Sequence, residues 1–296
     1  MVQQAVLDDL EAWGEDLGEA LGPAWRALRL RLRLREGPGY FLHPLALPIL
    51  QLPLWLALGP VPAPEAEVYD AAGSAAAGYL AVRIQDDLLD EGAGGSPADL
   101  MLALVLFARH HHLAARVAGP SAAFQELSEQ RWRAYAEAMA QEALLSPETP
   151  ITEARFQVLL QRSGPLLLPP AALLLPRAPA LLPALTRLVD HLARSHQLFT
   201  DAIDAEKDLR NGNRSRVLDR MGAAEGAQVV RRRLYLEGGL DEVTAEAVAL
   251  VEAARGEVRT LGLPQAEAWL DTRLATMEQV RQEAFATLFR RILADG

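Results

Sequence analysis

The chain has 296 residues, of which 50% are hydrophobic, and it carries a formal net charge of −10 and no cysteine. The lack of cysteine excludes disulfides, zinc–thiolate sites and a cysteine nucleophile, and it fits a reducing cytoplasm, where we expect the protein. The negative charge argues against broad nucleic-acid binding, which needs a basic surface. Almost every segment has helical periodicity and no alternating strand pattern persists, so we predict one all-α domain over residues 1–296.

The N-terminal part is predicted to contain an amphipathic helix, a basic stretch and a kinked apolar helix. The first helix covers Val2–Leu21, has the acidic composition of a mature protein rather than of a cleavable signal, and is ended by Gly22-Pro23. Residues 24–36 carry five arginines among leucines, which favours a solvated face, with anionic lipid as the minority alternative. Residues 40–59 resemble a membrane span, but their three prolines favour a kinked buried helix. Peripheral membrane contact is left open.

A long helix is predicted over Glu65–Glu91, and Gly92–Gly95 ends it. Ser96-Pro97-Ala98-Asp99 has the pattern of a helix start, with an N-cap serine, a proline in the first turn and an acidic third position. The helix that follows runs towards His110-His111-His112, which we expect at a partly exposed helix end. Three consecutive histidines point in three directions, whereas metal-binding pairs need i, i+4 spacing, so the pattern argues against a metal site there.

The rest of the chain is also predicted to be helical. Its expected elements are a helix over Ser121–Leu145, a turn at Ser146-Pro147-Glu148, a helix over Thr152–Ser163 that meets Gly164-Pro165, a broken buried segment over Leu166–Ala184, a helix over Leu185–Arg210 ended by Asn211-Gly212-Asn213, and two or three further helices with breaks near Gly238-Gly239 and Gly262.

Two of these helices carry a stripe of acidic residues in an apolar context. In the first, Asp86 and Asp90 lie about 40° apart around the helix and Asp87 lies about 60° from Asp90. The second stripe, within an arc of about 100°, consists of Thr200, Asp201, Asp204 and Asp208.

Stacked like charges destabilise a helix slightly, and burying them unpaired costs far more. A cation is therefore expected between the two stripes, and hard carboxylate oxygens suit Mg²⁺. Two solvated acidic faces are the simpler interpretation of either stripe alone, but two stripes in apolar surroundings favour a shared metal site.

With these residues in view, the chain resembles the class I isoprenoid synthase superfamily, which includes trans-prenyl diphosphate synthases, squalene/phytoene synthases and class I terpene synthases. Residues 86–90 resemble the first aspartate-rich motif of that superfamily, and residues 197–208 are similar to the second. Arg162-Ser163-Gly164-Pro165-Leu166 looks like the Lys-Thr element that grips the allylic diphosphate, and Ala140-Gln141 matches an upstream Gly-Gln signature in its glutamine. The resemblance covers roughly Gly37–Arg216.

The resemblance implies a single large helical bundle around a central active-site cavity, three Mg²⁺ ions with bound diphosphate, and a homodimer. The implied catalytic residues are Asp86, Asp90, Asp204, Asp208 and Arg162. The implied metal ligands are Asp86, Asp87, Asp90, Thr200, Asp201, Asp204 and Asp208. The implied substrate-binding residues are Tyr79, Arg83, Arg162, Ser163, Gln197, Lys207, Arg214 and Arg216. We expect residues 75–80 and 102–107 to form the cavity floor.

The sequence departs from chain-elongating synthases, which bind isopentenyl diphosphate through a basic cluster. Residues 39–44 lack the lysine and arginines of that cluster, Tyr79 stands where the family has histidine, and no arginine pair follows Asp90. A second diphosphate would therefore have few cationic partners. The pattern predicts a magnesium-dependent, terpene-synthase-like enzyme that ionises a C10–C20 allylic prenyl diphosphate rather than elongating it.

Three alternatives remain open on the sequence. Tyr79, Arg83 and Asp86 with Asp204, Asp208 and Gly212 resemble the pattern of squalene/phytoene synthases, which favours head-to-head condensation. A diverged polyprenyl diphosphate synthase is the second alternative. The third, from another class of protein, is a non-catalytic helical subunit that partners an active synthase.

Overall fold

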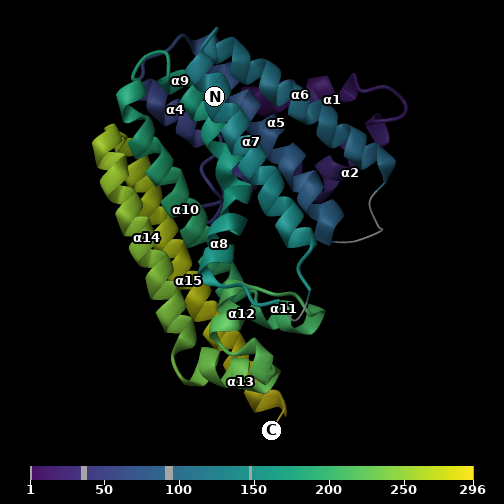
Figure 1. Cartoon of the computed structure of the whole chain (residues 1–296), viewed down its shortest axis with the longest axis vertical. Coiled ribbons are helices and arrows are strands. Elements are labelled where there is room, and N and C mark those ends of the chain that lie inside the picture. Colours follow the sequence, from purple (N-terminus) through teal and green to yellow (C-terminus); the bar gives the residue numbers. More distant parts are fainter. Residues whose placement is uncertain (1, 35–38, 91–95, 147–148, 296) are drawn as a thin grey trace.

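The computed structural model describes residues 2–34, 39–90, 96–146 and 149–295, with side chains left out at 39, 40, 90 and 287–295. The predicted all-α fold is confirmed, since the described residues form helices joined by turns and no strand (Figure 1). The predicted stops at Gly92–Gly95 and Pro147-Glu148 lie outside the described residues. None of the described helices combines the length and apolarity that crossing a membrane would require.

The first helix of the N-terminal region is shorter than the sequence predicted. Helix α1 covers Val2–Glu15 and not Val2–Leu21, and Gly22-Pro23 begins α2 (Gly22–Arg31) instead of ending α1. Proline suits a first helical turn because its missing N–H would have no partner there. Gly14 lies in the last turn of α1, where a Cβ would overlap the Trp25 indole, so the missing side chain lets α2 pack closely on α1.

The prediction of one kinked helix over residues 40–59 was wrong. Only α3 (Gly39–Leu42) and α4 (Gln51–Leu58) are α-helical, and residues 43–50 form a connection that we call the 43–50 loop. Pro44 and Pro48 explain the difference, because proline disfavours helix in the preceding residue and removes a backbone donor.

Helices α5 (Glu65–Asp90) and α6 (Pro97–Ala118) form a long packed pair, followed by α7 (Ala122–Ala143) (Figure 1). The predicted start of α6 is confirmed, since Ser96 caps it and forms a reciprocal capping box with Asp99. The expectation of a partly exposed helix end at His110 was wrong. The imidazole is 1% exposed and lies two turns before the end of α6, bonded to Ser74 of α5.

A chain of short helices crosses the middle of the molecule. Helix α8 (Glu153–Leu159) passes into the 3₁₀-helix η3 (Leu160–Leu167), so Gly164-Pro165 does not stop the helical path as predicted. The tighter 3₁₀ turn accommodates the proline, which has no N–H for an α-helical bond. The predicted break in the leucine–proline segment is confirmed: α9 (Leu168–Leu174) and the short turn η4 (Pro179–Leu181) are separate.

The second acidic stretch lies on two helices instead of one. Helix α10 (Leu182–Ile203) stops before Asp204, whose φ of −85° and ψ of 0° leave the helical range, and α11 (Ala205–Asn211) then begins. The predicted arc of about 100° from Thr200 to Asp208 therefore does not form on one continuous helix.

The C-terminal part adds long helices that pack beside α10 (Figure 1). Its elements are α12 (Arg216–Arg220), the 3₁₀ turn η5 (Ala223–Glu225), α13 (Ala227–Arg231), the π-helix η6 (Arg232–Leu236), α14 (Gly239–Leu261) and α15 (Pro264–Asp295). The predicted breaks near Gly238-Gly239 and Gly262 are confirmed. Gly262 has a φ of +65°, which glycine adopts without strain, and it turns the chain from α14 into α15.

Two apolar clusters form the core, and α5 contributes to both. One cluster is built mainly from the middle and C-terminal helices, and the other from α1, α2, α5 and α6. Ala71 belongs to the first and Ala72 to the second, although they are neighbours in sequence. Small alanines at these positions let other helices approach α5 closely on both sides.

Candidate active site

A cavity of about 180 Å³ opens between α5, α7, α10, the 3₁₀-helix η3 and the 43–50 loop. Its wall has an apolar part, which includes Ala75 and Val82 of α5 and Leu166, and a polar part that includes Arg83, Asp86 and Arg162. Six of the predicted site residues line it, namely Tyr79, Arg83, Asp86, Arg162, Ser163 and Gln197. The chain thus brings residues from α5, η3 and α10 to one hollow.

Arg162 lies at the centre of this constellation. Its Nη1 is 3.7 Å from Asp86 Oδ1 and donates to both carboxylate oxygens of Glu142, at 2.6 and 2.5 Å. Its Nη2 donates to Gln197 Oε1 at 3.2 Å. The short i→i+3 geometry of η3 directs this arginine between the two acidic stretches, where a positive charge offsets their repulsion.

The second acidic stretch joins the same network through Gln197. Its Nε2 donates to Asp201 Oδ1 at 2.7 Å, and Asp201 is 6% exposed. Burial raises the pKa of the Asp201 carboxyl to about 7, and the negative charge of Asp208 acts in the same direction. Asp86 and Asp201 therefore face each other across Arg162 and Gln197.

Asp87 differs from its neighbour Asp86. It is 8% exposed and forms ion pairs with Arg83 at 2.7 Å and Arg31 at 2.5 Å, so its carboxylate is engaged by α2 and by its own helix. It is not among the residues that line the cavity. Asp90 lies in the last turn of α5, but its side chain is outside the described residues.

The remaining residues of the second stretch do not line the cavity. The Thr200 hydroxyl donates to the His196 carbonyl oxygen at 2.8 Å, which ties it to its own helix. Asp204 sits at the break between α10 and α11, and Asp208 accepts from Asn213 Nδ2 at 3.4 Å. Lys207 is exposed on α11.

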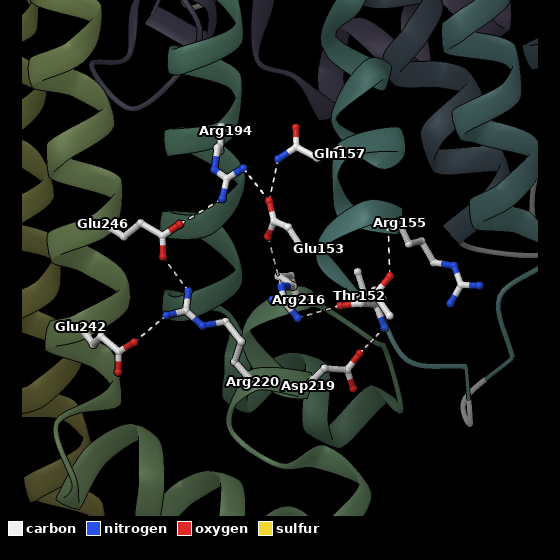
Figure 2. A network of polar contacts seen from close by, with 11 residues as sticks. Thr152, Glu153, Arg155, Gln157, Arg194, Arg216, Asp219, Arg220, Glu242 and Glu246 are labelled. Atoms are coloured by element: carbon white, nitrogen blue, oxygen red, sulfur yellow. Dashed lines mark hydrogen bonds and ion pairs between the residues drawn. The ribbon is translucent and has the colours of Figure 1, made fainter.

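Arg214 and Arg216 make protein contacts outside the cavity wall. Arg214 pairs with Asp219. Arg216 donates to the Ile151 carbonyl oxygen at 3.1 Å and lies 3.6 Å from Glu153, a contact seen in Figure 2. The backbone N–H of Arg216 also bonds to Asp201. Arg216 therefore connects the second acidic stretch to the polar network of Figure 2 through its main chain.

Several residues of the site were not predicted. Glu142, the closest anionic partner of Arg162, directly follows the Gln141 of the upstream signature; Gln141 itself bonds to Glu137 at the surface. His110 and His196 also line the cavity. Only Glu142 carried a usable sequence signal, because a position next to a matched motif is a reasonable candidate for the same site.

The cavity floor was predicted only in part. Ala75, Gly78 and Tyr79 line the cavity, as expected of residues 75–80. Residues 102–107 do not line it, because Leu102 and Leu106 are fully buried in the N-terminal cluster. Met139 of α7 and Leu47 of the 43–50 loop occupy the cavity wall instead.

The donor chemistry of the site fits Mg²⁺. Over the described residues, no three acidic or histidine side chains converge in an arrangement that would hold a metal ion by themselves. Mg²⁺, however, takes one or two carboxylates together with waters and substrate phosphate oxygens. Burial and the negative charge of Asp208 both disfavour the charged form of the Asp201 carboxyl, and a bound cation would favour it.

Comparisons with known proteins support the fold. No protein-family model matches the sequence, and no curated protein shows a significant match to it. The structure is similar to that of a geranylgeranyl pyrophosphate synthetase from the archaeon Geoglobus acetivorans, with a TM-score of 0.66, 14% sequence identity, and coverage of 95% of this chain and 98% of that chain. The chain therefore has the all-α fold of a prenyl diphosphate synthase over nearly its whole length.

Proposed function

We propose that the protein is a magnesium-dependent enzyme of isoprenoid metabolism that ionises a C10–C20 allylic prenyl diphosphate and releases diphosphate. The observation that carries this proposal is the bridge from Asp86 through Arg162 and Gln197 to Asp201. It gathers acids from distant parts of the chain and a guanidinium beside an apolar cavity, which is the arrangement that a diphosphate with a hydrocarbon tail would need.

The side chains divide into a charged part and an apolar part. Arg162 and Arg83 would bind diphosphate oxygens, and a guanidinium does so with two parallel hydrogen bonds. Apolar walls that include Ala75, Val82 and Leu166 would exclude water from the allylic cation and so protect it from capture. When bound, Mg²⁺ held by Asp86, Asp90, Asp204 and Asp208 would neutralise the charge that develops on the leaving group.

The site supports ionisation of one substrate better than chain elongation. Tyr79, which stands in the place of the family's histidine, lines the cavity and packs edge-on against buried Phe41 at a centroid distance of 5.8 Å. An aromatic pair at this position offers no charge to a second diphosphate. Together with the basic residues missing from residues 39–44, it favours a terpene-synthase-like reaction.

One observation favours the alternative of a non-catalytic subunit. Both aspartates at the start of the first motif already have arginine partners, Asp86 with Arg162 and Asp87 with Arg31. An inert relative could use these pairs only to stabilise its fold. Binding of substrate would instead require Arg162 to exchange Glu142 for diphosphate oxygens.

The test is incubation with geranyl, farnesyl and geranylgeranyl diphosphates in Mg²⁺, each with and without isopentenyl diphosphate. We expect diphosphate release that needs the allylic substrate and Mg²⁺ and does not need isopentenyl diphosphate. Release only with isopentenyl diphosphate, accompanied by a longer product, would establish elongation. A coupled product of doubled length would establish head-to-head condensation. No release with any substrate would support the non-catalytic subunit.

A further inference from the structure

The 43–50 loop separates the candidate active site from a second, smaller cavity. Leu47 and Ile49 of the loop, with Leu166, border both hollows. The second cavity has a volume of about 20 Å³, and its remaining walls are the apolar residues Pro48, Leu52, Val189 and Leu192. Displacing the loop side chains would therefore join the two hollows into one longer apolar channel.

A buried arginine from the far end of the chain holds this loop in place. Arg273 of α15 is 0% exposed, and its Nη1 donates to three successive carbonyl oxygens, those of Pro44 at 3.0 Å, Leu45 at 2.8 Å and Ala46 at 3.0 Å. Within the loop, the Leu45 and Ala46 N–H groups bond to His43 and the Ile49 N–H bonds to the Leu47 carbonyl, and the Leu45 backbone also bonds to His196 of α10. The Arg273 contacts thus fix the backbone directly before Leu47.

The partners of the Arg273 charge are the carbonyl groups of the loop and not a carboxylate. In the part of the chain that the structure describes, no carboxylate lies within ion-pair distance of it, and burial lowers its pKa to about 10. Its guanidinium lies 5.5 Å from the centroid of the Trp269 ring. A buried cation is costly unless oxygen atoms surround it, so the three carbonyl groups and the arginine stabilise one another.

We propose that Arg273 is a positioning residue that holds the 43–50 loop as a partition and thereby limits the length of the prenyl tail that the cavity accepts. This inference rests on the proposed function, since it concerns the apolar end of the same site. Without Arg273, three successive carbonyl groups lose the guanidinium donor, the loop relaxes, and Leu47 and Ile49 no longer close the cavity.

The experiment compares the Arg273→Met and Arg273→Lys variants with the wild type. Met removes the donors, whereas the Lys ammonium has three N–H donors for the three carbonyl groups. We expect Arg273→Met to raise the ratio of kcat/KM for geranylgeranyl diphosphate to that for geranyl diphosphate by about tenfold or more, and Arg273→Lys to stay near the wild-type ratio. A general loss of structure would lower both rates and leave their ratio unchanged.

Two further variants keep the proposal falsifiable. Ile49→Ala opens the partition without changing Arg273 and should shift the ratio in the same direction, even where Arg273→Met does not fold. Arg281→Met, the same substitution on the same helix but paired with Asp241 and Glu278 outside the cavity, should leave the ratio unchanged. An unchanged ratio in folded Arg273→Met or in Ile49→Ala would overturn the partition.

A separate readout distinguishes this proposal from the proposed function. If the wild type releases no diphosphate, the proposed function fails. The partition is then tested by measuring the binding of geraniol, farnesol and geranylgeraniol through the change in tryptophan fluorescence. We expect geranylgeraniol to gain at least about tenfold in affinity relative to geraniol in Ile49→Ala. Equal dependence on tail length in wild type and variant would contradict the proposal.

Discussion

Asp86 is the carboxylate that joins the first acidic stripe to Arg162 and to the cavity. The Asp86→Asn variant keeps the shape of the side chain but removes its charge. Because the proposed reaction needs that charge to hold Mg²⁺ beside the leaving group, we expect diphosphate release to fall by about a hundredfold or more. The measurement is diphosphate release from each allylic substrate at saturating Mg²⁺.

Asp16→Asn provides the matched control for this prediction. Asp16 is exposed and lies between α1 and α2, away from the cavity residues. It should leave the rate unchanged, and both variants should keep the helical circular dichroism of the wild type. A wild-type rate in Asp86→Asn would remove this residue from the metal site.

His110 gives the protein a stability that depends on pH. Burial lowers the pKa of this imidazole from 6.5 to about 4, with a contribution from His111 in the same direction. The unfolded chain binds a proton near pH 6.5, whereas the folded chain binds it only near pH 4. Stability is therefore retained above pH 6.5 and lost as the pH falls towards 4, by up to about 3 kcal/mol.

The measurement for His110 is the urea midpoint between pH 4 and 7 in wild type and in His110→Asn. Asparagine can keep a hydrogen bond to the Ser74 carbonyl oxygen while it removes the titrating group. The carboxylates contribute equally to both proteins, so the difference between the two curves reports His110. Parallel curves over this range would show that its titration does not affect stability.

The residues that the sequence predicted best are those whose position follows from helical phase alone. Tyr79, Arg83 and Asp86 share one face of α5, and all three line the cavity. Arg162 was predicted through its resemblance to a diphosphate-binding element. Its partner Glu142 was missed, because the contact depends on how α7 packs against η3, and no pattern within either segment encodes that packing.

At the scale of elements, a network of ion pairs fastens the short helices to the long ones (Figure 2). Arg194 of α10 bonds to Glu153 of α8 at 2.7 Å and to Glu246 of α14 at 3.2 Å. Arg220 of α12 bonds to Glu246 at 2.7 Å and to Glu242 at 2.6 Å. Glu246 is therefore shared by two arginines, and it connects α10, α12 and α14.

The network predicts unequal costs for two glutamates on the same helix. We expect Glu246→Ala to lower the free energy of unfolding by about 1 kcal/mol, because it leaves Arg194 and Arg220 with fewer partners. Glu242→Ala removes a largely exposed partner of Arg220 and should cost only a few tenths of a kcal/mol. Urea unfolding measures both, and equal losses would show that the network does not act as a unit.

The element boundaries show where sequence patterns stop being informative. Ser96 and Gly262 carry their own local chemistry, a side-chain cap and a positive φ, and both boundaries were predicted. The break at Asp204 has no proline or glycine to announce it. It arises where the chain leaves α10 to run beside α12, so only tertiary packing could reveal it.

For the whole molecule, α5 decides whether the two apolar clusters unfold together. It places Ala71 in one cluster and Ala72 in the other, so neither cluster can lose α5 without exposing the second. We expect one cooperative unfolding transition, in agreement with the predicted single domain. In urea, hydrogen exchange of α2 peptides and of α14 peptides should show the same midpoint.

Separate midpoints would contradict the single domain and would indicate that the N-terminal cluster folds by itself. The Ala72→Gly variant provides a sharper test. This change weakens α5 at its junction and should lower both midpoints together. A shift of the α2 midpoint alone would show that α5 does not couple the clusters.

The contact of Arg273 with residues 44–46 has a consequence for biosynthesis, since the two partners are 227 to 229 residues apart in the chain. The 43–50 loop is synthesised early, but its carbonyl groups receive the Arg273 donor only after α15 has been made. Under the proposed partition, the cavity of a nascent chain would therefore reach its full depth limit only once α15 has been synthesised and has packed against the loop.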